Sequence, residues 1–118
     1  MRIVLVLVSL TLVACGGSGG GPTEAPINLT SSGASPNAIT IPTGGRVHFF
    51  NKDTVDHQVA SSSCPDLVSP RLTPGTDSLR PIMTGPLACT FSDALTSSAS
   101  FNGTVTVNAP GTGGGGGY

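Results

Sequence analysis

Apolar and polar residues alternate with a period of two along much of the chain. In residues 46–51, Val47, Phe49 and Asn51 fall on one face of an extended segment, with His48 and Phe50 on the other. In residues 104–107 the two Val face one side and the two Thr face the other. No segment shows the i, i+3, i+4, i+7 apolar spacing of an amphipathic helix. The alternation therefore predicts an all-β domain.

Further short strands are predicted at residues 39–41, 58–61, 78–83 and 87–91. Turn residues recur roughly every ten positions between them, and Asn102-Gly103 is one such turn signal. This spacing predicts a sandwich of about seven strands. A small open barrel is consistent with the same pattern.

The N-terminus carries a membrane-targeting signal. Arg2 is followed by an apolar run over residues 3–13, which is too short to span a bilayer. Leu12-Val13-Ala14-Cys15 then resembles the lipobox of bacterial lipoproteins, in which the cysteine receives fatty acyl chains and becomes the first mature residue. The resemblance implies a signal peptide at residues 1–14 and a membrane anchor at Cys15; the alternative is an ordinary secretory signal with a chance cysteine.

Lipid anchoring implies a place in the bacterial cell envelope. Two or three acyl chains, at about 0.8 kcal/mol per buried CH₂, make such an anchor effectively permanent. Gly16 follows the cysteine where an Asp would resemble an inner-membrane retention signal, so the outer membrane is expected in a Gram-negative host.

Composition divides the remaining chain into three parts. Residues 15–25 are Gly- and Ser-rich, which predicts a flexible linker, and residues 110–118 contain five consecutive Gly, which predicts a disordered tail. The folded domain is expected over residues 26–109.

Charge limits the partners that this domain can bind. Charged residues make up 9% of the 118-residue chain, and after removal of residues 1–14 four basic residues face six acidic ones. Without a basic cluster the domain cannot neutralise several phosphates, which excludes nucleic acid and polybasic contact with lipids. The sequence does not indicate a protein partner.

Several segments between residues 39 and 107 occur in the order that is typical of cupredoxins. The segment from Asn51 to His57 (Asn-Lys-Asp-Thr-Val-Asp-His) resembles the part of that family that delivers the first metal-binding histidine. Residues 72–75 resemble a mid-chain turn, Cys89 stands where the ligand loop begins, and residues 102–107 resemble the closing strand. The resemblance implies a Greek-key β-sandwich, a copper cofactor and His57 as a ligand.

The second half of the expected copper site departs from the family pattern. A blue-copper centre needs a thiolate, two imidazoles and usually a weak axial Met. No His or Met follows Cys89 before the final strand, and the phase of His48 places it on the outer face. At best His57, Cys89 and Asp93 converge, so we expect a degenerate metal site. The alternatives for His57 are residual copper binding and a lone surface histidine at the mouth of a turn.

The two remaining cysteines suggest another role for Cys89. In an oxidising compartment Cys64 and Cys89 are expected to form a disulfide, and a disulfide sulfur cannot also be a thiolate ligand. The acidic residues are expected to be solvated turn residues: Asp53, Asp56, Asp66, Asp77 and Asp93. No catalytic triad motif surrounds either His, so a hydrolase is disfavoured. The sequence thus predicts a non-enzymatic binding or structural domain, with a copper-binding or electron-transfer lipoprotein as the alternative.

Overall fold

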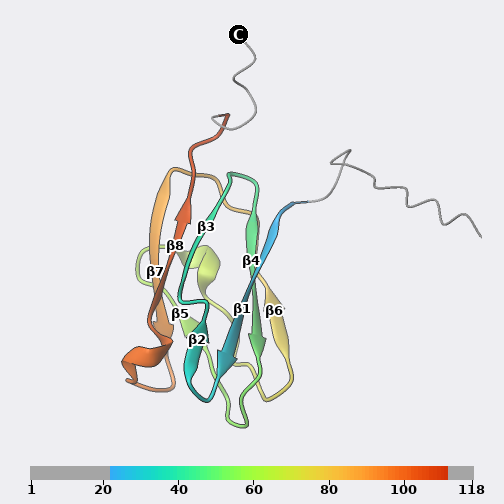
Figure 1. Cartoon of the computed structure of the whole chain (residues 1–118), viewed down its shortest axis with the longest axis vertical. Helices are drawn as coiled ribbons and strands as arrows, with labels where there is room; N and C mark the ends of the chain where they lie inside the picture. Colours follow the sequence, from blue (N-terminus) through green and yellow to red (C-terminus); the bar gives the residue numbers. More distant parts are fainter. Residues whose placement is uncertain (1–21, 112–118) are drawn as a thin grey trace, which may run out of the picture.

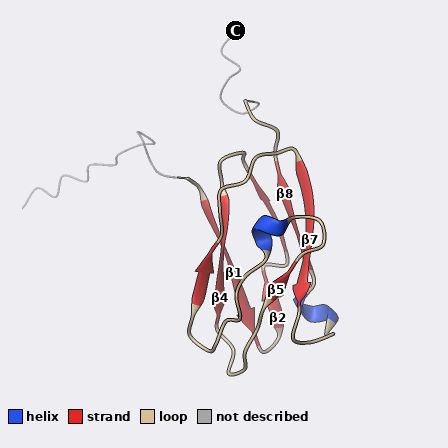
Figure 2. Ribbon diagram, turned by 180° about the vertical axis from the view of Figure 1, so that it is seen from behind, coloured by secondary structure: helices blue, strands red, loops and turns tan. Residues whose placement is uncertain are grey.

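The protein is an all-β sandwich in this computed structural model, which describes residues 22–111. Eight strands form two four-stranded sheets that face each other (Figures 1 and 2). The predicted sandwich is confirmed, with eight strands rather than about seven. The predicted signal peptide, Cys15 and residues 112–118 lie outside the described residues.

The first sheet has the strand order β2-β1-β4-β6. Its strands are β1 (Glu24–Thr30), β2 (Gly33–Ser35), β4 (Arg46–Asn51) and β6 (Asp77–Leu79). Strand β1 runs parallel to β4, whereas the β1–β2 and β4–β6 pairs are antiparallel. Burial alternates along β4, so the predicted inward face of that strand is confirmed.

The second sheet has the order β3-β8-β7-β5. Its strands are β3 (Ala38–Ile41), β5 (Val59–Ala60), β7 (Leu87–Asp93) and β8 (Gly103–Val107). Strand β3 is parallel to β8, and the other pairs are antiparallel. Two short 3-10 helices complete the described chain, η1 (Pro65–Leu67) after β5 and η2 (Ala99–Phe101) before β8.

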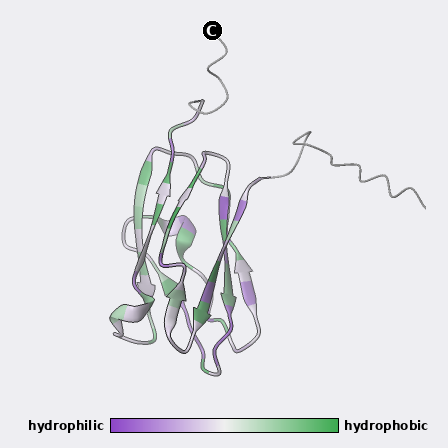
Figure 3. Ribbon diagram, viewed as in Figure 1, coloured by the Kyte–Doolittle hydropathy of each residue, from purple (hydrophilic) through white to green (hydrophobic). Residues whose placement is uncertain are grey.

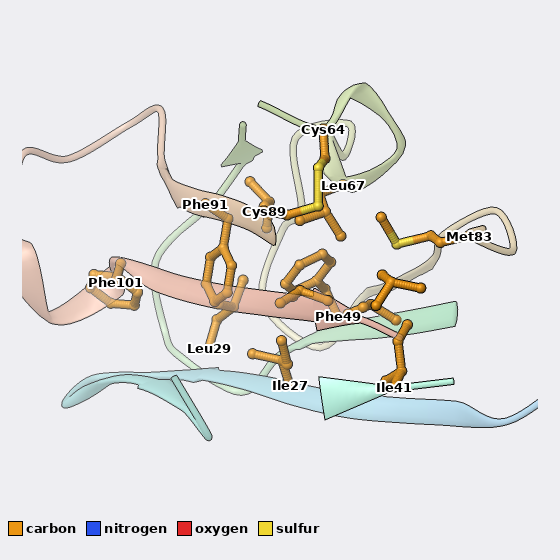
Figure 4. Close-up of a cluster of buried hydrophobic side chains, with 14 of the residues drawn as sticks. Ile27, Leu29, Ile41, Phe49, Cys64, Leu67, Met83, Cys89, Phe91 and Phe101 are labelled. Carbon is orange, nitrogen blue, oxygen red and sulfur yellow. A yellow bond between two sulfur atoms is a disulfide. The ribbon is translucent and has the colours of Figure 1, made fainter. Parts of the chain in front are cut away.

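The core fills the space between the two sheets, as Figure 4 shows for its central residues. Ile27, Leu29 and Phe49 come from the first sheet, and Phe91 comes from the second. The rings of Phe49 and Phe91 meet edge to face with centroids 5.7 Å apart, a favoured aromatic geometry. The two Val of β8, at 105 and 107, are buried as the alternation predicted.

A disulfide joins Cys64, just before η1, to Cys89 on β7. The Cα atoms are 5.6 Å apart, within the range for a disulfide, and the predicted pairing is confirmed. Both cysteines are buried, and Figure 4 shows the bridge packed against the core beside Leu67. The bridge ties the long β5–β6 connection to the second sheet.

The predicted ends of two segments, the N-terminal linker and the strand over residues 78–83, were wrong. Strand β1 starts at Glu24, so the expected linker over residues 15–25 overlaps the first strand of the sheet. Strand β6 ends at Leu79 rather than continuing to residue 83. Pro81 lacks the N–H that a ladder position would need, although Met83 N–H still donates to Gly45 O (2.8 Å).

Candidate functional site

His57 is buried, with 2% of its surface exposed, and lies between β4 and β5. Its backbone exchanges two hydrogen bonds with Leu72, at 2.9 and 2.7 Å, which hold it in an isolated bridge between two loops. The expectation of a lone surface histidine at the mouth of a turn is therefore wrong. The side chain points inward, where it meets two carboxylates.

Each ring nitrogen of His57 faces one of those carboxylates. Nε2 lies 2.8 Å from Asp53 Oδ2, and Nδ1 forms a short hydrogen bond with Asp93 Oδ2. An ionised carboxylate can only accept hydrogen bonds, so both ring nitrogens must donate. With both carboxylates ionised, His57 is an imidazolium that donates to each of them, and the three residues carry a net charge of minus one. We call it the Asp53–His57–Asp93 triad.

The first arm of the triad is built by the turn that follows β4. Buried Asn51 donates to Val55 O (2.9 Å) and Leu72 O (2.8 Å), and its Oδ1 accepts from Asp53 N–H (2.9 Å). Asp53 Oδ1 in turn accepts from Thr54 N–H (2.7 Å). These bonds leave Asp53 Oδ2 aimed at His57, so the Asn-x-Asp-x-x-x-His pattern is a self-supporting turn.

The second arm comes from the end of β7. Asp93 is buried, and its Oδ1 accepts from the backbone N–H groups of Gln58 (3.1 Å) and Leu95 (2.9 Å). Its Oδ2 is left for His57. The prediction that Asp53 and Asp93 are solvated turn residues is wrong, because both carboxylates are enclosed and bonded to the same ring.

The electrostatics of the triad favour its ionised form. Burial by itself would lower the pKa of His57, but the hydrogen bonds and charges of Asp93 and Asp53 outweigh burial, and its pKa is raised. The hydrogen bond from His57, followed by that from Thr54 N–H, lowers the pKa of Asp53. The ring of Phe101 in η2 packs on the imidazole with centroids 4.4 Å apart and closes one side of it.

Cys89 does not belong to this cluster. It lies four residues before Asp93 on β7, a distance of about 13 Å along an extended strand, and its sulfur is bonded to Cys64. The predicted convergence of His57, Cys89 and Asp93 is thus correct for His57 and Asp93 and wrong for Cys89. Asp53 completes the cluster in place of the thiol.

A hollow of about 550 Å³ opens beside the triad at this end of the sandwich. Val55 and Leu95, both exposed, form its apolar rim, and Phe101 lies deeper. Asp56 accepts from Arg71 Nε (2.8 Å) at its edge. Asp56 is therefore ion-paired at the surface, whereas the side chain of Asp66 is exposed, as expected of a turn residue.

His48 occupies a separate cluster on the outer face of the first sheet. Its Nε2 lies 2.6 Å from Asp77 Oδ2 and its Nδ1 3.4 Å from Glu24 Oε1, and its ring stacks on Phe50 at 4.0 Å. The polar starts of β1 and β4 are visible in purple in Figure 3. The predicted outward position of His48 is confirmed, and none of its partners is shared with His57.

Comparison with known proteins identifies the architecture. No protein-family model and no curated protein matches the chain. A purple cupredoxin from Nitrosopumilus maritimus superposes with a TM-score of 0.58 over 71% of this chain and 99% of that one, at 22% identity. Oxidized plastocyanin from Dryopteris crassirhizoma superposes with a TM-score of 0.59 over 71% and 100%, at 20% identity. This chain has the cupredoxin fold.

The cupredoxin fold also occurs as one part of a larger protein. A Cu-containing nitrite reductase from Thermus scotoductus SA-01 matches with a TM-score of 0.67 over 83% of this chain, at 22% identity. The matched region is 25% of that enzyme. The expected resemblance is confirmed for the fold. Whether the site fits a copper ion depends on the residues around His57.

The residues around His57 do not fit the copper centre that the cupredoxin fold implies. Such a centre needs a thiolate and a second imidazole beside the first. The groups that contact His57 are two carboxylates and the ring of Phe101. Within residues 22–111 no three His, Cys, Asp or Glu side chains are grouped to hold a metal ion. The carboxylates also bond to different nitrogens of one ring, so they do not converge on one ion.

The predicted anchor residue, Cys15, lies outside the described residues. Over residues 22–111, no helix has the length and apolar character needed to cross a bilayer.

Proposed function

We propose that this protein is an exported, lipid-anchored domain of cupredoxin fold that acts as a binding or structural module of the bacterial cell envelope, without a blue-copper centre. One observation carries the proposal: His57, the histidine that the fold would offer to copper, is bonded through both ring nitrogens to Asp53 and Asp93. A metal would have to displace a proton that two carboxylates stabilise.

The sulfur chemistry supports the same conclusion. Copper in a blue centre bonds to a thiolate, and Cys89 is held in a buried disulfide with Cys64. Reducing that bond would still leave Cys89 about 13 Å along β7 from the residue that touches His57. Electron transfer through a copper–thiolate bond therefore has no residue to carry it in the described domain.

The same hydrogen bonds support a non-enzymatic role. A histidine acts as a general base only when one ring nitrogen is free to accept a proton, and both nitrogens of His57 donate to carboxylates. The hydroxyls of Ser31 and Thr96 line the neighbouring hollow, but neither bonds to the imidazole. The domain is therefore assigned to binding or support rather than to hydrolysis.

The place of action rests on the lipobox-like segment ending at Cys15. An acylated Cys15 would hold the domain close to a membrane surface. The domain itself carries no basic cluster for lipid headgroups, so the acyl chains would supply the attachment. The outer membrane is the expected location if the host is Gram-negative.

The direct test is to add copper to the purified full chain and record its visible spectrum. We expect no intense Cu–thiolate absorption from the native protein. His57→Gln serves as the matched variant, because it removes the only imidazole of the triad, and its spectrum should be the same as that of the native chain. Intense absorption from the native chain would instead establish the alternative, a copper-binding or electron-transfer lipoprotein that uses His57.

A further inference from the structure

A groove of about 910 Å³ lies on the outer face of the second sheet, away from the triad. The strand register explains its floor: Ala38 pairs with Thr104, Thr104 pairs with Thr90, and Ser92 pairs with Ala60. All of these residues are small, and the burial pattern of β7 and β8 turns Thr90, Ser92 and Thr104 outward. A row of short side chains across four strands leaves the hollow.

The groove presents hydrogen-bonding groups that the domain does not use. Among residues 22–111, five polar lining side chains make no hydrogen bond to the rest of the protein. They are the hydroxyls of Ser62, Ser92 and Thr104 and the amides of Asn37 and Asn102. Together they offer both donors and acceptors around one hollow.

No charged side chain lines the groove. A charged ligand would lose hydration there with no opposite charge to compensate it, so phosphates, carboxylates and ammonium groups are poor occupants. Ala38, Ala60 and Val68, the last 40% exposed, add apolar contact between the polar groups. A purely apolar ligand would desolvate the five polar side chains without pairing them, which is also unfavourable.

One wall of the groove is held rigidly. Ser61 Oγ donates to Thr90 O (2.5 Å) and accepts from Cys64 N–H (3.0 Å), and Ser63 Oγ accepts from Thr90 N–H (2.9 Å). The disulfide from Cys64 to Cys89 then fixes this wall covalently to β7, one residue before Thr90. A wall that is already ordered costs little conformational entropy when a ligand binds.

We propose that this groove binds an uncharged oligosaccharide. A sugar ring has hydroxyls that both donate and accept, a C–H face that suits the alanine and valine contacts, and no charge. An extended peptide fits less well, because a peptide that paired with an edge strand, β3 or β5, would lie beside the sheet and leave the outward hydroxyls of Ser92 and Thr104 uncovered. Oligosaccharide binding in this groove would be independent of the chemistry at His57.

The experiment is a calorimetric titration of the full chain, purified in a detergent without a sugar headgroup. Maltohexaose, cellohexaose and chitohexaose are titrated separately. Comparison of the three titrations shows whether the groove binds an α-glucan, a β-glucan or an N-acetylglucosamine polymer. Thr104→Lys places a long charged side chain on the floor, and Thr40→Lys places one on the same sheet face at a residue outside the groove.

We expect at least one oligosaccharide to bind to the native chain. Its affinity for Thr104→Lys should be at least tenfold lower, and its affinity for Thr40→Lys should be unchanged. Ser62→Lys, on the loop wall, should weaken binding in the same way and replaces Thr104→Lys if that variant fails to fold. Absence of binding to all three oligosaccharides, or equal affinity of the groove and control variants, would overturn the proposal.

Discussion

At the scale of single residues, the charges of Asp53, His57 and Asp93 depend on one another. Two carboxylates flank one ring, so both of them receive a ring N–H only while His57 is protonated. Removing one member of such a buried group leaves charges or N–H groups without partners, which typically destabilises a protein by several kcal/mol. The triad is thus best understood as an electrostatic link between the β4–β5 turn and β7.

Replacing Asp93 by Ala should lower the free energy of unfolding by roughly 3–5 kcal/mol. The change removes the acceptor for Gln58 N–H, Leu95 N–H and His57 at once. Urea unfolding followed by circular dichroism measures the loss. Asp66→Ala is the matched control, because Asp66 is exposed, and it should change the stability by less than about 0.5 kcal/mol.

The stability contributed by His57 should depend on pH with a defined sign. Its pKa is raised on folding from about 6.5, so its contribution is complete below that pH and is lost as the pH rises through the folded value. The difference in unfolding free energy between the native chain and His57→Gln should therefore shrink above about pH 6.5. A difference that grows with rising pH would show that the histidine is neutral when folded.

The pairing of His57 with Asp93 could be anticipated only in part from the sequence. Alternation places Cys89, Phe91 and Asp93 on one face of a strand, and two of these are obvious core residues. An acidic residue in phase with them is a signal of a buried carboxylate that needs a partner. That the partner would be His57, 36 positions away, depends on the pairing of β5 with β7, in which Val59 lies opposite Asp93, and no local pattern specifies that pairing.

At the scale of secondary-structure elements, β7 connects the two halves of the domain. Its inward face carries Cys89 in the disulfide, Phe91 in the core and Asp93 in the triad, at successive alternate positions. The strand therefore receives a covalent bond, an aromatic contact and an ion pair from other parts of the chain. Its register against β8 fixes the positions of Cys89 and Phe91, and its pairing with β5 fixes that of Asp93.

Replacing Cys89 by Ser should lower the free energy of unfolding by roughly 2–5 kcal/mol, the usual cost of losing a disulfide in a small secreted domain. The mature protein, denatured without reductant, should show no thiol reactive with a disulfide-exchange reagent, and two after reduction. Full stability in the variant, or two reactive thiols before reduction, would contradict the bridge between Cys64 and Cys89.

Strands with regular alternation were predictable, and strands defined by distant pairing were not. Residues 46–51 and 104–107 alternate cleanly, and both form strands at the predicted positions. Strand β1 also alternates, with Ile27 and Leu29 inward, but it follows a Gly-rich segment and contains Pro26, a weak strand former. Its place in the sheet comes from parallel pairing with β4, about twenty residues later in the chain.

At the scale of the whole molecule, the chain combines a disulfide-bonded sandwich with a proposed lipid anchor. The described domain is stabilised by one core, one disulfide and the triad, which suits a chain with fewer than a hundred folded residues. The groove and the triad lie on different parts of this sandwich, so ligand binding and site integrity can be tested separately.

Replacing Cys15 by Ala should prevent acylation and move the protein out of the detergent-soluble membrane fraction. Without the thiol, the acyl chains that would hold the domain at the bilayer cannot be attached. Cell fractionation with an antibody against the domain, together with metabolic labelling by a fatty acid, measures both effects. A variant that is still processed and membrane-bound would contradict the lipobox interpretation.

The most direct test of the central claim is the protonation state of His57, read by two-bond proton–nitrogen correlation NMR near neutral pH. The signals of the two histidines are separated with a His48→Gln variant. Both ring nitrogens of His57 should carry protons, and one equivalent of Cu(I) should leave them unchanged. A neutral His57 ring, or loss of a ring proton when Cu(I) is added, would contradict it.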